Sequence, residues 1–243
     1  MLSTRVSIQW PPEPAGEDTK TIVITTPDNH FVDLRAYIDH YPYRNQGSEE
    51  FENVFQWCSC GVERPIANSS KIEFCQEINS IAIWKSIRAN ESLAPPEPDI
   101  GDFSSIPNSE DRKEVGTMTN SASGKRQPYV EIWRSLDPNE NSLEHEVRQS
   151  SHTTVNKVFT LVVSSAGYTG KLVRVGNWAQ GIIYDKSNKE RPLHVIQSHL
   201  KGSWSTLLAY GAIELFPVSF DGCINDTVRI SHLEWKCIEQ MAQ

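Results

Sequence analysis

One stretch of the chain carries several side chains that could contact a ligand. Residues 170–184 read GKLVRVGNWAQGIIY, which has the apolar and β-branched content of a strand. If this stretch is one continuous strand, alternation places four polar or aromatic side chains on the same face. These are Arg174, Trp178, Gln180 and Tyr184. A cation, an indole, an amide and a phenol together suit either a ligand-filled barrel interior or a solvated outer face.

A later predicted strand, 204–210, repeats the mixture with Trp204 and Tyr210 on one face. The two glycines at 176 and 181 do not form a phosphate-binding loop. No Lys-Ser/Thr pair follows them, and no predicted helix begins there whose N-terminus could hold an anion.

The sequence Cys58-Ser59-Cys60 is the nearest approach to a metal motif. Alternation on a strand would put both thiols on one face. A structural zinc site needs four ligands, and no second Cys/His pair follows at a useful spacing. We therefore predict that these cysteines are small fillers of a core strand, and we expect neither a metal nor a cofactor.

The charge and the cysteine count limit the classes of partner and the compartment. The net charge is −8, which argues against nucleic acid or an anionic membrane as the main partner. We find no apolar run of signal-peptide or membrane-span length. Five cysteines at irregular positions disfavour a disulfide framework, so we expect a location in the reducing cytoplasm, and in the nucleus as well.

The chain reads as a series of short β-strands separated by Gly, Asn, Asp, Ser and Pro clusters, which favours antiparallel barrels or sandwiches. A Pro- and acid-rich stretch at 91–114 is predicted to be a long surface loop, and 143–148 is the only weakly helical segment. The predicted strands are 20–26, 31–38, 51–59, 71–76, 80–87, 128–135, 157–164, 170–184, 193–199, 204–210 and 227–239.

Six of the seven tryptophans suggest an internal duplication. They form the triplets Trp10, Trp57, Trp84 and Trp133, Trp178, Trp204, with spacings of 47 and 27 residues against 45 and 26. Two strand–turn–strand segments, KTIVITTPDNHFVDLR and FTLVVSSAGYTGKLVR, also correspond. We therefore predict two barrel domains, 1–124 and 125–243, with Trp57 and Trp178 on equivalent strands.

Several blocks of the chain resemble, in order, those of the fungal Hri proteins. The blocks are KTIVITTPDNHFVDLR, FQWCSCG, GTMTNSASGKRQPYVEIWRSLDP, VRVGNWAQGIIYD and LLAYG. The resemblance implies two lipocalin-like β-barrels in tandem and an interaction with a casein kinase I. After Trp57 the family's usual pattern is Trp-Ala-Phe-Ala-Gly, whereas this chain has Trp-Cys-Ser-Cys-Gly. The chain is also similar to small fungal β-barrel enzymes, the hetero-Diels–Alderases of tropolone–sesquiterpenoid pathways.

This second resemblance implies a cofactor-free enzyme of secondary metabolism that acts on an apolar or aromatic small molecule. A cycloaddition needs a pocket that holds both partners in reacting geometry, and a few hydrogen-bond donors for the developing charge. The predicted walls are Trp57, Trp178, Trp204 and Tyr210, and the predicted donors are Arg174, Gln180 and Tyr184.

Two alternatives remain open. The first is a non-catalytic adaptor that docks a casein kinase I through the acidic serine-rich segment around Ser104, Ser105, Ser109, Glu110 and Asp111. The second is a passive carrier of a lipid or pigment, which would use the same barrel interior as the enzyme.

Overall fold

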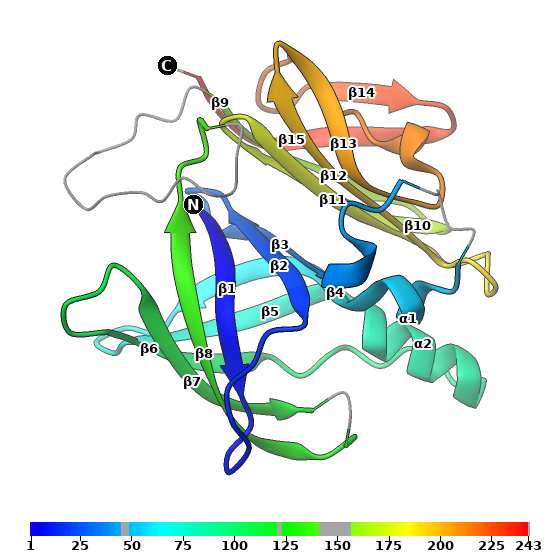
Figure 1. The fold of residues 1–243 in the computed structure, drawn as a ribbon. Helices are drawn as coiled ribbons and strands as arrows, with labels where there is room; N and C mark the ends of the chain where they lie inside the picture. The colour runs from blue at the N-terminus through cyan, green and yellow to red at the C-terminus, as the bar shows by residue number, and fades with distance from the viewer. Residues whose placement is uncertain (45–48, 121–122, 141–156, 243) are drawn as a thin grey trace.

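The structure, a computed structural model, describes residues 1–44, 49–120, 123–140 and 157–242. These residues form an all-β molecule in which neighbouring strands pair antiparallel, as the sequence predicted (Figure 1). The weak helical prediction at 143–148 lies outside the described residues. None of the described helices is long and apolar enough to span a membrane.

The first eight strands close into a barrel in up-and-down order, the arrangement of lipocalin barrels. Each strand pairs with the next one in the sequence, and β8 returns to pair with β1. The strands are β1 (Leu2–Gln9), β2 (Thr19–Thr25), β3 (His30–Tyr37), β4 (Phe55–Pro65), β5 (Lys71–Asn79), β6 (Asp99–Ser105), β7 (Arg112–Thr119) and β8 (Arg126–Leu136).

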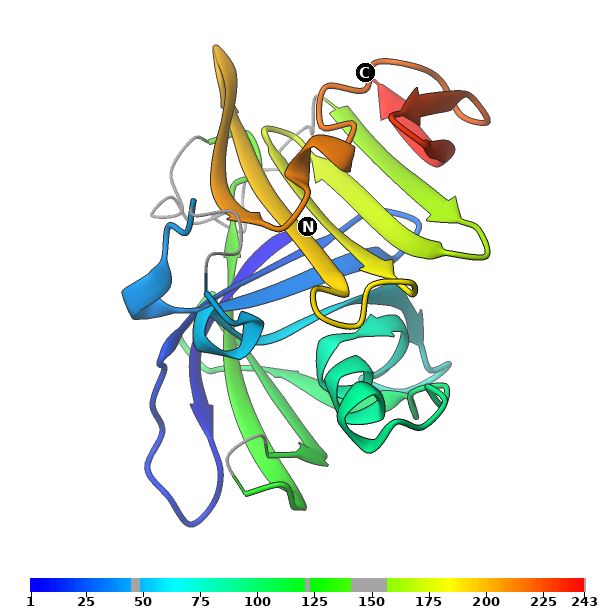
Figure 2. The ribbon, with the colours of Figure 1, turned by 90° about the vertical axis from the view of Figure 1, so that its right-hand side faces the viewer.

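Where a second barrel was expected, the described strands form a seven-stranded antiparallel sheet, which Figure 2 shows lying across the barrel. Its order is β13-β12-β11-β10-β9-β15-β14. The strands are β9 (Lys157–Ser164), β10 (Tyr168–Val175), β11 (Trp178–Asp185), β12 (Leu193–Lys201), β13 (Ser203–Tyr210), β14 (Thr227–Ile230) and β15 (Leu233–Ala242).

The expected boundary between residues 124 and 125 is wrong, because it falls inside the barrel. Strand β8 begins at Arg126 and pairs with β7 over eight residues, from Arg112 with Trp133 to Thr119 with Arg126. The same strand closes the barrel against β1. The first unit therefore continues to Leu136, and Trp133 belongs to it rather than to the second unit.

The structure contradicts three local predictions. The stretch 170–184 is a hairpin, since Gly176 has a φ of +61° and turns the chain between β10 and β11. The stretch 91–114 contains all of β6 and the start of β7. The segment 80–87 is part of a helix, α2 (Ser80–Ala89).

Helix α2 forms because its sequence has both a cap and helical periodicity. The side chain of Asn79 accepts a hydrogen bond from the backbone N–H of Ala82, which satisfies one of the free amides of the first turn. Ile83, Trp84 and Ile87 are spaced to share one face, which packs on the core. The shorter helices are α1 (Phe51–Val54), η1 (Ile38–His40) and η2 (Ile213–Leu215).

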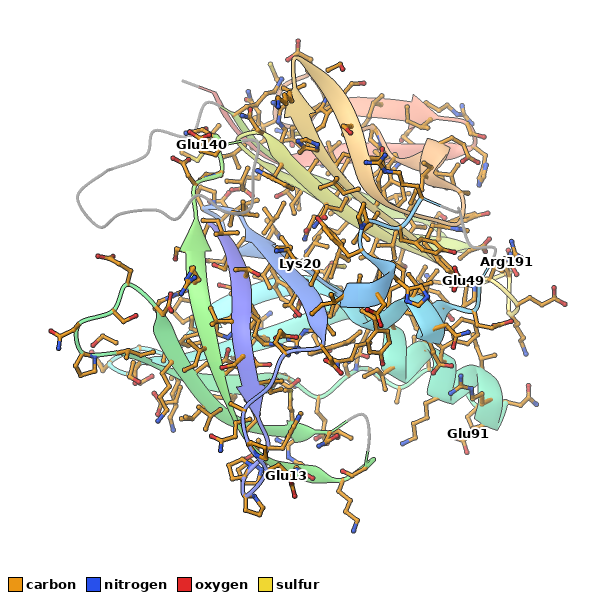
Figure 3. The ribbon with its side chains drawn as sticks, in the orientation of Figure 1. Glu13, Lys20, Glu49, Glu91, Glu140 and Arg191 are labelled. Atoms are coloured by element: carbon orange, nitrogen blue, oxygen red, sulfur yellow. The ribbon has the colours of Figure 1, made fainter. Side chains whose placement is uncertain are left out.

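One face of the second sheet packs on the outside of the barrel. Strands β10 and β11 contact β2, β3 and β4, and Figure 3 shows side chains filling the space between the two units. Burial of each large apolar side chain here contributes about 1.5–3 kcal/mol to stability. The buried apolar residues of the barrel side include Ile22, Ile24, Val32, Leu34, Cys58 and Cys60, and those of the sheet side include Val173, Trp178, Ile182 and Val195.

The other face of the second sheet is also a packed core. Leu215, Phe216 and Phe220, which follow β13, cover it together with Trp235 of β15, whose indole N–H donates to the carbonyl of Leu215 at 3.0 Å. All four side chains are buried. This face, which carries Ala179 and Ile183 of β11, is therefore filled by the chain itself, whereas the face of β11 that was expected to hold a ligand lies against the barrel.

Polar side chains also cross the interface between the two units. Gln180 of β11 donates from Nε2 to the carbonyls of Ile22 and Val32, at 3.2 and 3.1 Å. Its Oε1 accepts from Gln197, whose own Oε1 accepts from the Tyr41 hydroxyl at 2.7 Å. Both amides are fully buried. The chain of hydrogen bonds therefore fixes the position of the second sheet on the barrel.

Replacing Gln180 with Leu should lower the free energy of unfolding by about 1–3 kcal/mol, because the buried amide of Gln197 loses its acceptor. Urea unfolding measures this change. Gln240→Leu, at a half-buried position of β15, is the matched control and should stay within about 0.5 kcal/mol of the wild type. Equal losses in the two variants would contradict a specific role for Gln180.

Candidate functional site

The barrel contains a cavity that opens to solvent. Its empty volume is about 700 Å³ including the opening. Aromatic side chains form much of its wall, and charged side chains from five strands reach into it. The lining includes Phe31, Asp33, Arg35, Trp57, Phe74, Asp99, Phe103, Arg112, Glu114, Tyr129, Glu131 and Trp133.

A second hollow shares four lining residues with the first, namely Arg35, Trp57, Asp99 and Met118, and continues the interior toward the N-terminus of α2. Its rim includes Gln56, Asn79, Ile81 and Thr119. This is the barrel end that carries the β1–β2 loop with Glu13, whereas Glu140 lies beyond the opposite end, after β8 (Figure 3).

Two arginines and their carboxylate partners form a buried network inside the barrel. Arg35 donates to Asp33 at 2.7 Å and to Glu131 at 3.2 Å. Arg5 donates to Glu131 at 2.7 Å and to Glu17 at 2.6 Å. Burial lowers the pKa of Arg35, but Asp33 and Glu131 raise it further, so this guanidinium stays charged. Glu131 therefore has a charged partner on each side.

Glu114 has a different environment, because only neutral donors reach it. The Tyr129 hydroxyl and the Trp133 indole N–H each donate to one of its oxygens, both at 2.7 Å. Glu114 also lies directly opposite Glu131 in the β7–β8 pair. Burial and the charge of Glu131 raise the pKa of Glu114 from an ordinary 4.5 to about 8. Glu114 is therefore mostly protonated at neutral pH.

Two glycines provide the space for this arrangement. A Cβ at Gly101 of β6 would lie 2.2 Å from Oε1 of Glu114, and one at Gly116 of β7 would lie 2.6 Å from the Tyr129 hydroxyl. Both contacts are far shorter than a Cβ can tolerate. The absence of side chains at these two positions thus lets the carboxyl group and the phenol meet inside the barrel.

Some buried polar atoms that border the cavity have no partner among the described residues. They are Oδ1 of Asp33, Nε1 of Trp57 and Nε of Arg112. Asp33 and Trp57 lie on neighbouring strands, because Arg35 pairs with Trp57 and Asp33 with Ser59. The guanidinium of Arg35 covers the Trp57 ring at 4.3 Å. A buried acceptor and a buried donor that lack partners destabilise the folded protein unless a ligand or water forms hydrogen bonds with them.

The structure brings only one of the predicted site residues, Trp57, into this cavity. Gln180, Trp178 and Tyr184 face the interface between barrel and sheet, where Trp178 donates to the carbonyl of Glu140 at 2.8 Å. Tyr210 is buried in the same interface and donates to the carbonyl of Glu49 at 3.1 Å.

Arg174 and Trp204 lie on the opposite face of the second sheet from Gln180. The prediction that Arg174 shares a face with Trp178 is wrong, because the turn at Gly176 resets the alternation. In the hairpin Arg174 is opposite Ala179, while Val175 is opposite Trp178. The guanidinium of Arg174 instead lies over the Trp204 ring at 4.9 Å. The predicted donors and walls therefore do not form one pocket.

The prediction that Trp57 and Trp178 occupy equivalent positions is also wrong. Both KTIVITTPDNHFVDLR and FTLVVSSAGYTGKLVR are hairpins, β2–β3 and β9–β10, as expected. When they are aligned on Arg35 and Arg174, the residue paired with the arginine is Trp57 in the first unit and Ala179 in the second. Trp178 is thus one position out of register and faces the other side of its sheet.

Cys58 and Cys60 are buried fillers of the interface core, as predicted, and their thiols have raised pKa values because they are buried. In the described ranges, no group of three His, Cys, Asp or Glu side chains is arranged to hold a metal ion.

Sequence reasoning missed Arg5, Glu114 and Glu131. For Glu114 and Glu131 the signal was alternation within RKE and YVEIW, where charged or aromatic residues recur at every second position. These patterns give the face of each strand, but they do not show that the charged face points into a barrel.

Comparison with known proteins identifies relatives over the whole chain. The model of the Protein HRI1 family matches residues 1–239. Protein HRI1 of Kluyveromyces lactis is 27% identical over 98% of both chains, and Protein HRI1 of Saccharomyces cerevisiae strain S288c is 24% identical over 99% of both. The crystal structure of a Saccharomyces cerevisiae protein described as uncharacterized has a TM-score of 0.79 at 21% identity, covering 99% of this chain and 98% of that one.

Replacing Glu114 with Gln should make the protein more resistant to rising pH. A carboxyl group whose pKa is raised on folding destabilises the folded state once the unfolded chain ionises, so its cost is absent below pH 4.5 and grows up to about pH 8. The free energy of unfolding of the variant, relative to the wild type, should therefore increase across this window. Urea unfolding at several pH values measures it.

Glu234→Gln, at an exposed position of β15, is the control and should show no such trend. A difference between Glu114→Gln and the wild type that stays constant from pH 4.5 to 8 would show that Glu114 is ionised in the folded protein.

Proposed function

Because the chain belongs to the Protein HRI1 family and its first unit is a closed barrel with a solvent-connected interior, we propose that this barrel binds a small molecule. The observation that carries the proposal is the cavity itself, with aromatic walls and with unpartnered buried polar atoms of Asp33 and Trp57 at its border. Ligand pockets combine apolar and aromatic walls with a few convergent polar groups in this way.

The chemistry of the lining favours a ligand with polar groups rather than a plain hydrocarbon chain. A fatty chain would leave the free oxygen of Asp33 and the indole N–H of Trp57 unsatisfied in a dry cavity, which costs free energy. A flat molecule that carries both a donor and an acceptor could satisfy both groups while its rings contact Tyr129 and Trp133. The carrier alternative is therefore restricted to polar, partly aromatic cargo.

The second candidate function is a cofactor-free cyclisation of hetero-Diels–Alder type inside the same cavity. The observation that favours it is Glu114, a mostly neutral carboxylic acid at the wall of an aromatic cavity. Such a group could donate a hydrogen bond to a carbonyl oxygen as negative charge develops on it. This mechanism would replace Arg174, Gln180 and Tyr184 as donors with residues of the first barrel.

Less of the segment 91–114 is free to dock a kinase than the sequence suggested. Residues 99–105 are strand β6 of the barrel, so deleting the segment would open the barrel. Asp111 is bound to Arg134 by two hydrogen bonds of 2.9 Å. Ser92, Ser104, Ser105 and Ser109 of this segment are exposed, but Ser104 and Ser105 belong to strand β6 and pair with β7.

Filling the cavity tests the proposal. Val23 of β2 lines the cavity, and Val23→Phe adds volume there without removing a polar group. We expect ligand-detected NMR with a set of small aromatic fragments to find binders of the wild type. Their affinity for Val23→Phe should be at least about tenfold weaker, which corresponds to about 1.4 kcal/mol.

Ile224→Phe is the matched control, because Ile224 is exposed in the second unit, far along the chain from the barrel. It should bind the fragments as the wild type does. If the wild type binds no fragment, or if Val23→Phe binds them equally well, the proposed function is overturned.

A further inference from the structure

The carboxyl groups inside the barrel outnumber the cations that face them. Arg5 and Arg35 are the two cations of the buried network, and they are shared among three carboxylates that accept hydrogen bonds from them. These carboxylates are Glu17, Asp33 and Glu131. Glu114 is a fourth carboxyl group in the same interior and has no cation of its own. Arg112 is a third cation at the cavity wall, so these four carboxyl groups exceed the arginines by one.

Glu114 is oriented as an acceptor even though it lacks a cation. Both of its oxygens receive donors, Tyr129 on one and Trp133 on the other. A carboxylate with two donors needs only a nearby positive charge to remain ionised. Without that charge, burial and Glu131 keep a proton on Glu114.

An independent observation places a second acceptor at the same cavity. Asp33 is 6% exposed, and its Oδ1 has no hydrogen-bond partner in the described structure, although Oδ2 accepts two bonds from Arg35. An incoming ammonium group has three N–H donors and would satisfy such an oxygen. A neutral or anionic group without a donor would leave it unsatisfied.

The cavity also holds cations against aromatic rings already. Arg35 lies over Trp57 at 4.3 Å, and Arg112 lies over Phe103 at 5.6 Å. The electron-rich ring faces attract cations, and aromatic walls around an ammonium are a recurrent means of binding it. Tyr129 and Trp133 border the cavity beside Glu114 and are bound to it.

We propose that the ligand of the barrel is an arylalkyl amine, with the amino group on an aliphatic chain, bound as its ammonium ion, with Asp33 and Glu114 as acceptors and Tyr129 and Trp133 as walls. This inference depends on the proposed binding function and names the chemical class of the ligand. It includes proton exchange: the ammonium ion supplies the missing charge, Glu114 gives up its proton to solvent, and no bond of the ligand changes.

The charged groups around Glu114 come from several strands and determine the pH dependence. They are Arg5 on β1, Asp33 and Arg35 on β3, Asp99 on β6, Arg112 on β7, and Tyr129 and Glu131 on β8. Arg5 and Arg35 remain bound to their carboxylates, and the pKa of Glu114 is raised to about 8, so Glu114 changes ionisation near neutral pH. Amine affinity should therefore rise as the pH increases from 6 toward 8.

Arg112 would favour an anionic ligand instead of an amine. Nε of Arg112 has no partner, and its charge lies toward the end of the cavity that carries Glu63 and Met1. An anionic ligand could bind there. The arginines of the central network, in contrast, are occupied by Glu17, Asp33 and Glu131.

Three probes of one shape separate these possibilities: 2-phenylethylamine, 2-phenylethanol and phenylacetate, which carry a positive, a zero and a negative charge. Isothermal titration with the full chain at pH 7.5 should give an affinity for the amine at least tenfold above that for the alcohol or the acid. Titrations in buffers of different ionisation enthalpy should show proton release on binding the amine, and affinity should increase by up to tenfold per pH unit between pH 6 and 8.

Glu114→Gln should lose the amine preference and the proton release, and a circular dichroism spectrum like that of the wild type checks that the variant is folded. Glu234→Gln is the charge-matched control and should behave as the wild type. Equal or tighter binding of the alcohol overturns the amine inference and leaves the binding function intact, and so does tighter binding of phenylacetate. If none of the three binds, the amine inference is overturned, and the cavity-filling variant decides the binding function separately.

Discussion

The structure depends on how strands β2, β3 and β4 divide their side chains between two faces. Alternate residues such as Ile22, Val32 and Cys58 point outward and are covered by the second sheet. The residues between them, such as Asp33 and Arg35, point into the barrel. An ordinary soluble barrel places its apolar residues inside. Because the second sheet buries the outer face here, the apolar core of the molecule lies between the two units and the barrel interior is free to be polar.

Burying charged groups inside the barrel costs free energy of folding. Ion pairs between these groups offset that cost. Charged groups buried without partners would destabilise the barrel by several kcal/mol each. Arg5 and Arg35 are therefore bound to carboxylates from other strands, and Glu131 joins the two arginines. Glu114 is the exception, since it is stabilised by a proton and by two neutral donors. Glu114, which has no cation bound to it, and Asp33, which has an unpartnered oxygen, both line the cavity, which is the arrangement expected where a ligand completes a site.

Local patterns in the sequence predicted the strands and hairpins well, because alternation and turn residues act over a few positions. They could not predict which strands close the barrel: β8 belongs to the first unit through its pairing with β1, more than 120 residues away in sequence. The turn at Gly176 also determines which predicted site residues share a face. A continuous strand at 170–184 would have put Arg174 beside Trp178, but the positive φ of Gly176 ends β10 and reverses the face of every later residue. Alternation in VDLR and YVEIW indicates that each strand has a charged or aromatic face. It does not show that these faces meet inside one barrel.

The two units use the same hairpin differently. In the first, the arginine at the end of the second strand of the hairpin, Arg35, lies in a cavity against Trp57. In the second, Arg174 lies over Trp204, and the face it shares is closed by Leu215, Phe216 and Phe220. One face of this sheet is thus filled by its own chain, and the other is packed against the barrel. Its contribution is to cover β2 to β4, and without that cover the outward apolar residues of the barrel would face water. The second unit is thus the support that permits a charged cavity in the first.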